Sequence, residues 1–127
     1  MTSPATSDLC DAHKADPDLR VLPPAFRSYG ARPRFCGPVA TVKCFEDNTH
    51  VKAAVESPGQ GRVLVVDGGG SVRRALLGGN LGRAAAQNGW AGVVIDGAVR
   101  DVLELAASAI GVRALASVPL PTIRRNE

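Results

Sequence analysis

The chain has few aromatic residues and no long apolar run. Phe, Trp and Tyr make up only 4% of its 127 residues, and its apolar runs are only a few residues long. A membrane-spanning helix needs about 20 consecutive apolar residues, so we expect no membrane span. Residues 1–5 also lack the basic and apolar regions of a secretory signal peptide. We therefore expect a cytoplasmic protein.

Cysteine is scarce, and its spacing excludes two classes of small protein. Cys10, Cys36 and Cys44 are odd in number and form no C-x-x-C pair. This pattern argues against a disulfide framework and against a zinc site. We expect reduced and mostly buried thiols.

The excess of positive charge is small. The formal net charge is +3, and the arginines form only a loose cluster at residues 27–34 and a pair at residues 124–125. Clustered basic residues give phosphate affinity, but the scarcity of aromatic residues leaves few platforms on which bases could stack. We expect a solvated basic surface and no direct binding of nucleic acid.

Length and patterning predict a single α/β domain spanning residues 1–127. The chain is 45% hydrophobic and 21% charged, which suits one core. Apolar periodicity, glycines and prolines predict helices over about residues 7–13, 49–56, 82–88 and 102–107, and strands over 20–22, 39–45, 62–67 and 93–95.

The most informative segment runs from Trp90 to Asp101. Residues 93–95 are a β-branched run bounded by glycines, which is typical of a strand covered on both faces. Arg100 and Asp101 follow where this strand turns into a helix, and ligands of α/β sheets bind outside the carboxyl ends of strands. Arg100 could bind a carboxylate and Asp101 a hard divalent cation. The alternatives are an ion pair between them, or Asp101 as a helix cap.

Two glycine clusters have different interpretations. Residues 68–70 follow a strand, but the third glycine of G-x-G-x-x-G would fall at Arg73, so the dinucleotide fingerprint is absent. Residues 78–81 precede a predicted helix closed by Gly89, and the free N–H groups of a helix start can bind an anion. The alternative for residues 78–81 is a turn with a helix cap.

Five segments in order carry a resemblance to a known family. They are residues 7–12 (SDLCDA), 26–30 (FRSYG), 35–48 (FCGPVATVKCFEDN), 65–70 (VVDGGG) and 90–101 (WAGVVIDGAVRD). They resemble the regulator of ribonuclease activity A family, whose metal-dependent members are 4-hydroxy-4-methyl-2-oxoglutarate aldolases. The resemblance implies a swivelling β/β/α fold and a homotrimer or a dimer of trimers.

The resemblance also implies roles for particular residues. Arg100 would bind a small 2-oxo acid and help to neutralise a pyruvate enolate, and Asp101 would ligate Mg²⁺ or Mn²⁺. The substrate carboxylate would be oriented by the amides of Gly78, Gly79, Asn80 and Leu81.

The residues favour a metal over a lysine Schiff base for enolate stabilisation. Lys14, Lys43 and Lys52 lie in predicted helices or strands away from Arg100, and none has an activating pattern. His13 and His50 show no ligand spacing, so we expect both at the surface.

The chain departs from the family pattern at Gly79. Metal-dependent members resemble D-x20-R-D, and twenty residues before Arg100 this spacing reaches Gly79, followed by Asn80. The absent acid would affect aldol cleavage more than decarboxylation of oxaloacetate, because only aldol cleavage needs a base for a hydroxyl proton. On this basis Gly79→Asp would raise aldol cleavage.

The end of the chain is a second departure. Family members continue past the segment that matches residues 111–116 into further glycine-rich strands, whereas this chain turns at Pro119 and Pro121 and stops at Glu127. We expect shortened C-terminal strands, with an exposed edge or face that subunit contacts could cover.

Two functions from different classes remain. The first is a metal-dependent lyase that cleaves 4-hydroxy-4-methyl-2-oxoglutarate and decarboxylates oxaloacetate through a pyruvate enolate. The alternative is a non-catalytic regulator that binds and inhibits ribonuclease E. Arg100 and Asp101 favour the enzyme, while Gly79 and the short end favour the regulator.

The enzyme hypothesis predicts dependence on a divalent cation. A single carboxylate among waters holds Mg²⁺ weakly and exchangeably, so EDTA should abolish pyruvate release from oxaloacetate and added Mg²⁺ should restore it. Asp101→Ala should abolish turnover as well. Undiminished turnover in chelated enzyme would contradict the metal mechanism and direct attention to Lys43 and Lys52.

Overall fold

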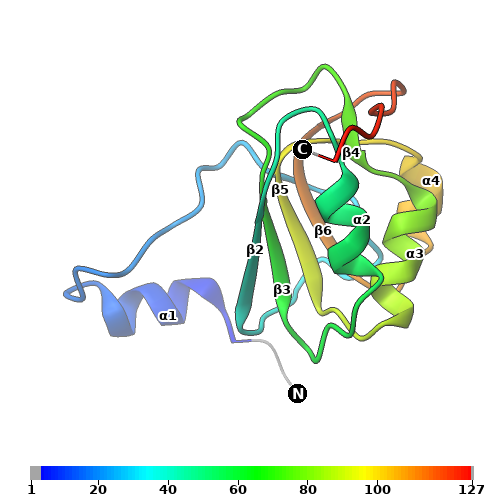
Figure 1. Ribbon diagram of the computed structural model, residues 1–127. Helices are drawn as coiled ribbons and strands as arrows, with labels where there is room; N and C mark the ends of the chain where they lie inside the picture. Colours follow the sequence, from blue (N-terminus) through cyan, green and yellow to red (C-terminus); the bar gives the residue numbers. More distant parts are fainter. Residues whose placement is uncertain (1–3, 127) are drawn as a thin grey trace.

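The fold is built on one six-stranded sheet, mostly parallel. The computed structural model describes residues 4–126. The strands follow the order β1-β6-β5-β3-β2, and β4 pairs with the end of β5 (Figure 1). Only β1 is antiparallel to its neighbour. The strands are β1 (Arg27–Ser28), β2 (Val39–Lys43), β3 (Val63–Asp67), β4 (Ala75–Leu77), β5 (Gly92–Val99) and β6 (Gly111–Ser117).

Helices α2 (Thr49–Val55), α3 (Gly79–Gln87) and α4 (Val102–Ala106) cover one face of this sheet (Figure 1). Alternate residues of each strand point toward them, as the period of two in a strand requires. The core formed between sheet and helices includes Leu64, Val66, Val93, Ile95, Val112 and Ala114 from the strands and Val51, Val55, Leu81, Ala85 and Leu105 from the helices. The predicted α/β class is confirmed.

The opposite face of the sheet is only partly covered. Val65, Val94 and Arg113 are in register across β3, β5 and β6, and all three are half-buried. The expectation that residues 93–95 are covered on both faces is therefore wrong, because helices α2, α3 and α4 all pack on one side of the sheet (Figure 1). Helix α1 (Thr6–His13) buries no residue and extends from the sheet beyond β2 (Figure 1).

Phe35 attaches the N-terminal segment to this partly covered face. Gly92 and Gly111 are paired neighbours on β5 and β6, and a Cβ at either position would overlap the Phe35 ring. The two glycines thus leave a flat area of backbone that the aromatic ring fills, so this contact holds residues 33–37 against the sheet.

Several local predictions need correction. Residues 20–22 form no strand, because they lie in an exposed segment with no neighbouring strand. Strands β1, β4 and β6 were not predicted, α3 begins three residues earlier than expected, and β5 continues to Val99, four residues beyond the predicted end. The other predicted helices and strands are present, with small differences at their ends.

The cysteines are free, but only Cys44 is fully buried, whereas Cys10 and Cys36 are half-buried. Burial, and then the negative charges of Asp47 and Asp67, raise the pKa of the Cys44 thiol to about 11. This thiol is therefore protonated at neutral pH and a poor nucleophile. Within residues 4–126, no helix is long and apolar enough to cross a membrane.

The Phe35 contact predicts a measurable contribution to stability. Phe35→Ala should lower the free energy of unfolding by about 2 kcal/mol, less than the ~3–5 kcal/mol lost when a fully buried Phe is truncated, because Phe35 is half-buried. Phe45→Ala is the matched control: Phe45 is 58% exposed, and we expect a change within about 0.5 kcal/mol. Urea denaturation of both variants tests this, and equal losses would contradict the role of Phe35.

Candidate active site

Two adjacent strands end together and place two helix starts side by side. Strand β4 pairs in parallel with the end of β5, with Leu77 opposite Val99. The backbone N–H of Arg100 then donates to the Leu77 carbonyl at 3.0 Å. Because β4 leads directly into α3 and β5 into α4, the residues that follow both strands meet at one corner of the sheet.

Asp101 joins these two helix starts. It adopts the left-handed conformation, with φ at 56°, which is uncommon for residues other than Gly and found most often in Asn and Asp. Its side chain makes no capping bond to its own helix, α4. Instead its Oδ2 accepts the N–H of Gly79 at 2.9 Å. Asp101 therefore caps the neighbouring helix α3, which the alternative cap interpretation did not foresee.

An ion pair between Arg100 and Asp101, the other alternative, is present but loose. Arg100 Nε lies 3.8 Å from Asp101 Oδ2, and the two side chains are 40% and 37% exposed. A pair at this distance and exposure contributes little to stability. Both side chains thus remain accessible to a ligand.

Two glycines allow these charged side chains to approach α3. A Cβ at Gly78 would lie 2.7 Å from Asp101 Oδ2 and 3.2 Å from Arg100 Nε. A Cβ at Gly79 would overlap the Oε2 atom of Glu104. Neither glycine has a positive φ, so it is the close approach of three charged side chains, and not backbone conformation, that favours glycine here.

All six residues predicted for the site line one small cavity. Its volume is about 180 Å³, below the ~300–1,000 Å³ of drug-sized pockets, which suits a small metabolite. Arg100 and Asp101 also line an adjoining cavity of about 230 Å³ beside the end of β6. The lining of the first cavity comprises Asn48, Ala75, Gly78, Gly79, Asn80, Leu81, Arg100, Asp101, Pro121, Thr122 and Arg124.

The start of α3 keeps unused hydrogen-bond donors. The first N–H groups of a helix have no acceptor within the helix. The N–H of Gly79 already donates to Asp101. It is therefore less available to a substrate than the resemblance implied. The amides of Asn80 and Leu81 have no acceptor in their own helix and belong to residues of the cavity wall.

Glu104 is an acidic neighbour of the site that the sequence interpretation missed, and it lines an adjacent cavity with Arg83 rather than the cavity of Arg100 and Asp101. Its carboxylate lies against Gly79 and 3.9 Å from Arg83, with 56% of its side chain exposed. Its spacing from Asp101 was the available signal, since residues three apart on a helix share a face. An acidic side chain is therefore present beside position 79, although it comes from α4 and not from α3.

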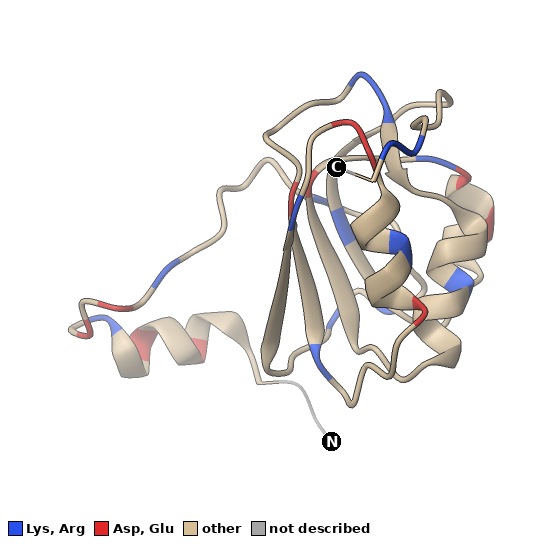
Figure 2. Ribbon diagram, in the orientation of Figure 1, with Lys and Arg blue, Asp and Glu red and all other residues tan. Residues whose placement is uncertain are grey.

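The lysines and histidines lie elsewhere. Lys43 ends β2, Lys52 pairs with Glu56 at 2.8 Å on α2, and none of the lysines lines the cavity. His13 and His50 are exposed, as predicted. Figure 2 shows the charged corner between β5 and α4 and the basic end of the C-terminal tail at the same end of the sheet.

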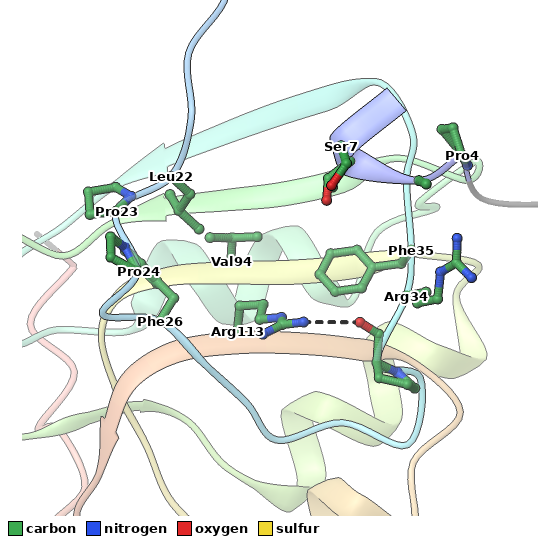
Figure 3. Close-up of a pocket in the computed structure, with 13 residues that line it drawn as sticks. Pro4, Ser7, Leu22, Pro23, Pro24, Phe26, Arg34, Phe35, Val94 and Arg113 are labelled. Atoms are coloured by element: carbon green, nitrogen blue, oxygen red, sulfur yellow. Dashed lines mark hydrogen bonds between the residues drawn. The ribbon is translucent and has the colours of Figure 1, made fainter. Parts of the chain in front are cut away.

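A larger cavity, of about 620 Å³, lies on the other side of the molecule. The N-terminal segments form its walls over the partly covered face of the sheet, with Phe26, Phe35 and Val94 around it (Figure 3). Arg113 at its floor donates to the carbonyl of Pro33 at 3.2 Å. Among residues 4–126, no carboxylate, histidine or cysteine lines this cavity, so these residues offer it fewer groups for acid–base or metal chemistry than the corner at Arg100 and Asp101.

Comparison with known proteins identifies the family of the chain. The family model described as RraA-like, Aldolase/RraA, matches residues 6–127. The chain belongs to the RraA-like family. Among solved structures, the RNA-processing inhibitor RraA from Thermus thermophilis superposes with a TM-score of 0.92 at 48% identity, over 99% of this chain and 75% of that one.

Two sequence relatives carry an enzyme's name. A protein of Albidiferax ferrireducens is 69% identical over 133 residues, which cover 97% of this chain and 77% of the relative. One of Cupriavidus taiwanensis is 56% identical over 126 residues, with 97% and 76% covered. Both are named "Putative 4-hydroxy-4-methyl-2-oxoglutarate aldolase".

The site geometry predicts that Arg100 cannot be replaced by lysine. A compact ammonium cannot reproduce two parallel hydrogen bonds to a carboxylate or enolate. Arg100→Lys should cost roughly 2–4 kcal/mol of transition-state stabilisation, as for loss of one oxyanion donor. The melting temperature should not change, because the contact that ties Arg100 to β4 is made by its backbone. Pyruvate release from oxaloacetate and thermal melting test this together; unchanged turnover would contradict the role of Arg100.

Proposed function

We propose that the protein is a metal-dependent lyase that cleaves 4-hydroxy-4-methyl-2-oxoglutarate and decarboxylates oxaloacetate. The observation that carries the proposal is the convergence of Arg100, Asp101 and Glu104 on the N-terminus of α3. A guanidinium, a carboxylate and free backbone amides line the small cavity, and the carboxylate of Glu104 lies beside it against Gly79. These groups match the needs of a reaction that passes through a pyruvate enolate.

The 2-oxo acid end of the substrate would lie between Arg100 and the start of α3. The amides of Asn80 and Leu81, at the positive end of the helix dipole, would hold the carboxylate. The guanidinium of Arg100 would donate to the same end of the substrate and stabilise the negative charge that develops on the 2-oxo oxygen.

The donor set fits a hard cation. Mg²⁺ is commonly held by one or two carboxylates, with waters and substrate oxygens as its remaining ligands. Asp101 supplies one carboxylate at the cavity, and within residues 4–126 no group of three or more His, Cys, Asp and Glu side chains is placed to hold a metal ion. Asp101, with waters and substrate oxygens, would hold Mg²⁺ or Mn²⁺, which would polarise the 2-oxo group of the substrate.

Both reactions break the bond between C3 and C4 of the substrate. In oxaloacetate, CO₂ leaves and the electron pair of the broken bond forms the enolate of pyruvate, which takes a proton at C3. In 4-hydroxy-4-methyl-2-oxoglutarate, the C4 hydroxyl first loses its proton and C4 leaves as the ketone of a second pyruvate. Arg100 serves both reactions because both place negative charge on the same oxygen.

Only the aldol reaction needs a base, and Glu104 is placed to provide one. Its carboxylate occupies the space into which an acidic side chain at position 79 would extend. We therefore assign to Glu104 the proton transfer from the C4 hydroxyl, directly or through a water. This changes the expectation for Gly79→Asp, since the new carboxylate would collide with Glu104 and repel its charge.

Moving the carboxylate from position 104 to position 79 tests this assignment. Glu104→Ala should lower aldol cleavage by about 10²-fold or more, the typical contribution of general acid–base catalysis, with a smaller effect on decarboxylation. Adding Gly79→Asp to Glu104→Ala should restore part of the aldol activity, because the space is then open. Turnover of both substrates by the single and double variants is the measurement.

The single variant Gly79→Asp is the control for this exchange, and it should show no gain in aldol cleavage. A gain in the presence of Glu104, or undiminished aldol cleavage by Glu104→Ala, would show that Glu104 does not act as the base.

The second candidate function is regulation of ribonuclease E without catalysis. It is supported by the 48% identity to a protein described as an RNA-processing inhibitor. A wild-type protein that binds ribonuclease E but releases no pyruvate from either substrate would favour this function over the lyase.

The partly exposed sheet face suits the trimers that the family resemblance implies, because parallel sheets are normally covered on both faces.

A further inference from the structure

The C-terminal tail forms a wall of the candidate active site that the reaction described above does not use. Pro121, Thr122 and Arg124 line the same cavity of about 180 Å³ as Arg100 and the start of α3. The tail, which follows strand β6, thus brings a second arginine, Arg124, to the cavity.

The tail is held at this place by backbone contacts to β4. The N–H of Ala75 donates to the Leu120 carbonyl at 2.8 Å, and Ala75 forms a parallel bridge with Pro121. Arg74 Nη1 donates to the Pro121 carbonyl at 3.0 Å. The segment that carries Arg124 therefore has a fixed origin beside the cavity.

Asn48 orients Arg124. Asn48 is only 8% exposed, and its Nδ2 donates to the Leu76 carbonyl at 3.2 Å, which fixes the direction of the amide. Its Oδ1 accepts the Thr122 hydroxyl at 2.8 Å and Arg124 Nε at 3.1 Å. Since Nε is engaged by Asn48, the four N–H groups of the two terminal nitrogens remain for another acceptor.

Among residues 4–126, no carboxylate forms a salt bridge with Arg124. Of the acids near it, the buried Asp47 accepts the N–H groups of Thr49 and Arg125, and Asp101 and Glu104 are associated with Gly79, Arg100 and Arg83. The cavity thus contains one arginine beside the proposed 2-oxo acid position and another with no anionic partner.

We propose that Arg124 binds the distal carboxylate of a dicarboxylic 2-oxo acid, and so selects dicarboxylic over monocarboxylic substrates. The proposal rests on the proposed function, because the 2-oxo acid end must lie at Arg100 and α3. A guanidinium and a carboxylate form two parallel hydrogen bonds. A substrate without the distal carboxylate leaves this charge unpaired, which is the basis of strong discrimination.

Arg124 should affect aldol cleavage and decarboxylation differently. During aldol cleavage the distal carboxylate keeps its charge, so Arg124 contributes binding throughout the reaction. During decarboxylation of oxaloacetate the distal carboxylate loses its charge as CO₂, so a cation there would stabilise the ground state more than the transition state. Arg124 therefore favours 4-hydroxy-2-oxo dicarboxylic acids as substrates.

Binding of two matched ligands tests the proposal without turnover. The ligands are 2-oxoglutarate and 2-oxopentanoate, which share a five-carbon chain and differ in the distal carboxylate, titrated calorimetrically in the presence of Mg²⁺. Wild-type protein should bind 2-oxoglutarate more tightly, by about tenfold or more, as expected for hydrogen bonds to a charged group. Arg124→Gln should remove this difference and leave the affinity for 2-oxopentanoate unchanged.

Arg125→Gln is the matched control, since it removes the same charge one residue further along. It should leave both affinities unchanged. The proposal is wrong if Arg125→Gln removes the preference for 2-oxoglutarate as Arg124→Gln does. It is also wrong if Arg124→Gln lowers the affinity for both ligands equally.

Arg100→Lys distinguishes failure of this proposal from failure of the proposed function. If wild-type protein binds both ligands equally and Arg100→Lys weakens both, the 2-oxo acid site stands and the role of Arg124 is refuted. If wild-type protein binds neither ligand, the proposed function fails, and the inference about Arg124 fails with it.

Discussion

One hydrogen bond, from the N–H of Gly79 to the carboxylate of Asp101, holds the candidate site together. It joins the start of α3 to the corner between β5 and α4, two places 22 residues apart in sequence. The left-handed backbone of Asp101 is the conformation in which its side chain reaches α3. Such backbone costs about 1–3 kcal/mol and is found preferentially at functional sites, so its presence here agrees with a functional corner.

The two glycines at residues 78–79 leave space for this hydrogen bond and for the side chains around it. Any side chain at either position would displace Arg100, Asp101 or Glu104. The glycines let a helix start approach three charged groups closely, and the same approach leaves helix amides at the cavity. Carboxylates, a guanidinium and backbone donors thus share a small volume because α3 presents no side chain there.

Much of this corner could be predicted from the sequence, because its signals are local. A β-branched run followed by Arg100 and Asp101, and glycines before a helix, mark two strand ends where α/β sheets bind ligands. Glu104 escaped prediction because its position beside Gly79 depends on how α3 and α4 pack, which no spacing within one segment reveals. The wall formed by Thr122 and Arg124 was missed for the same reason. Strand β4 has only three residues, too few for a periodic signal, and the segment at 20–22 has strand-forming residues but no neighbouring strand.

The central claim is that this corner binds the enolate form of a 2-oxo acid together with a divalent cation. Oxalate is a planar dianion with two adjacent oxygens, and so resembles the enolate of pyruvate without reacting. Calorimetric titration of oxalate with and without Mg²⁺ is the most direct test. The account predicts tight binding that requires Mg²⁺. Binding of equal strength in chelated protein, or no binding at all, would contradict it.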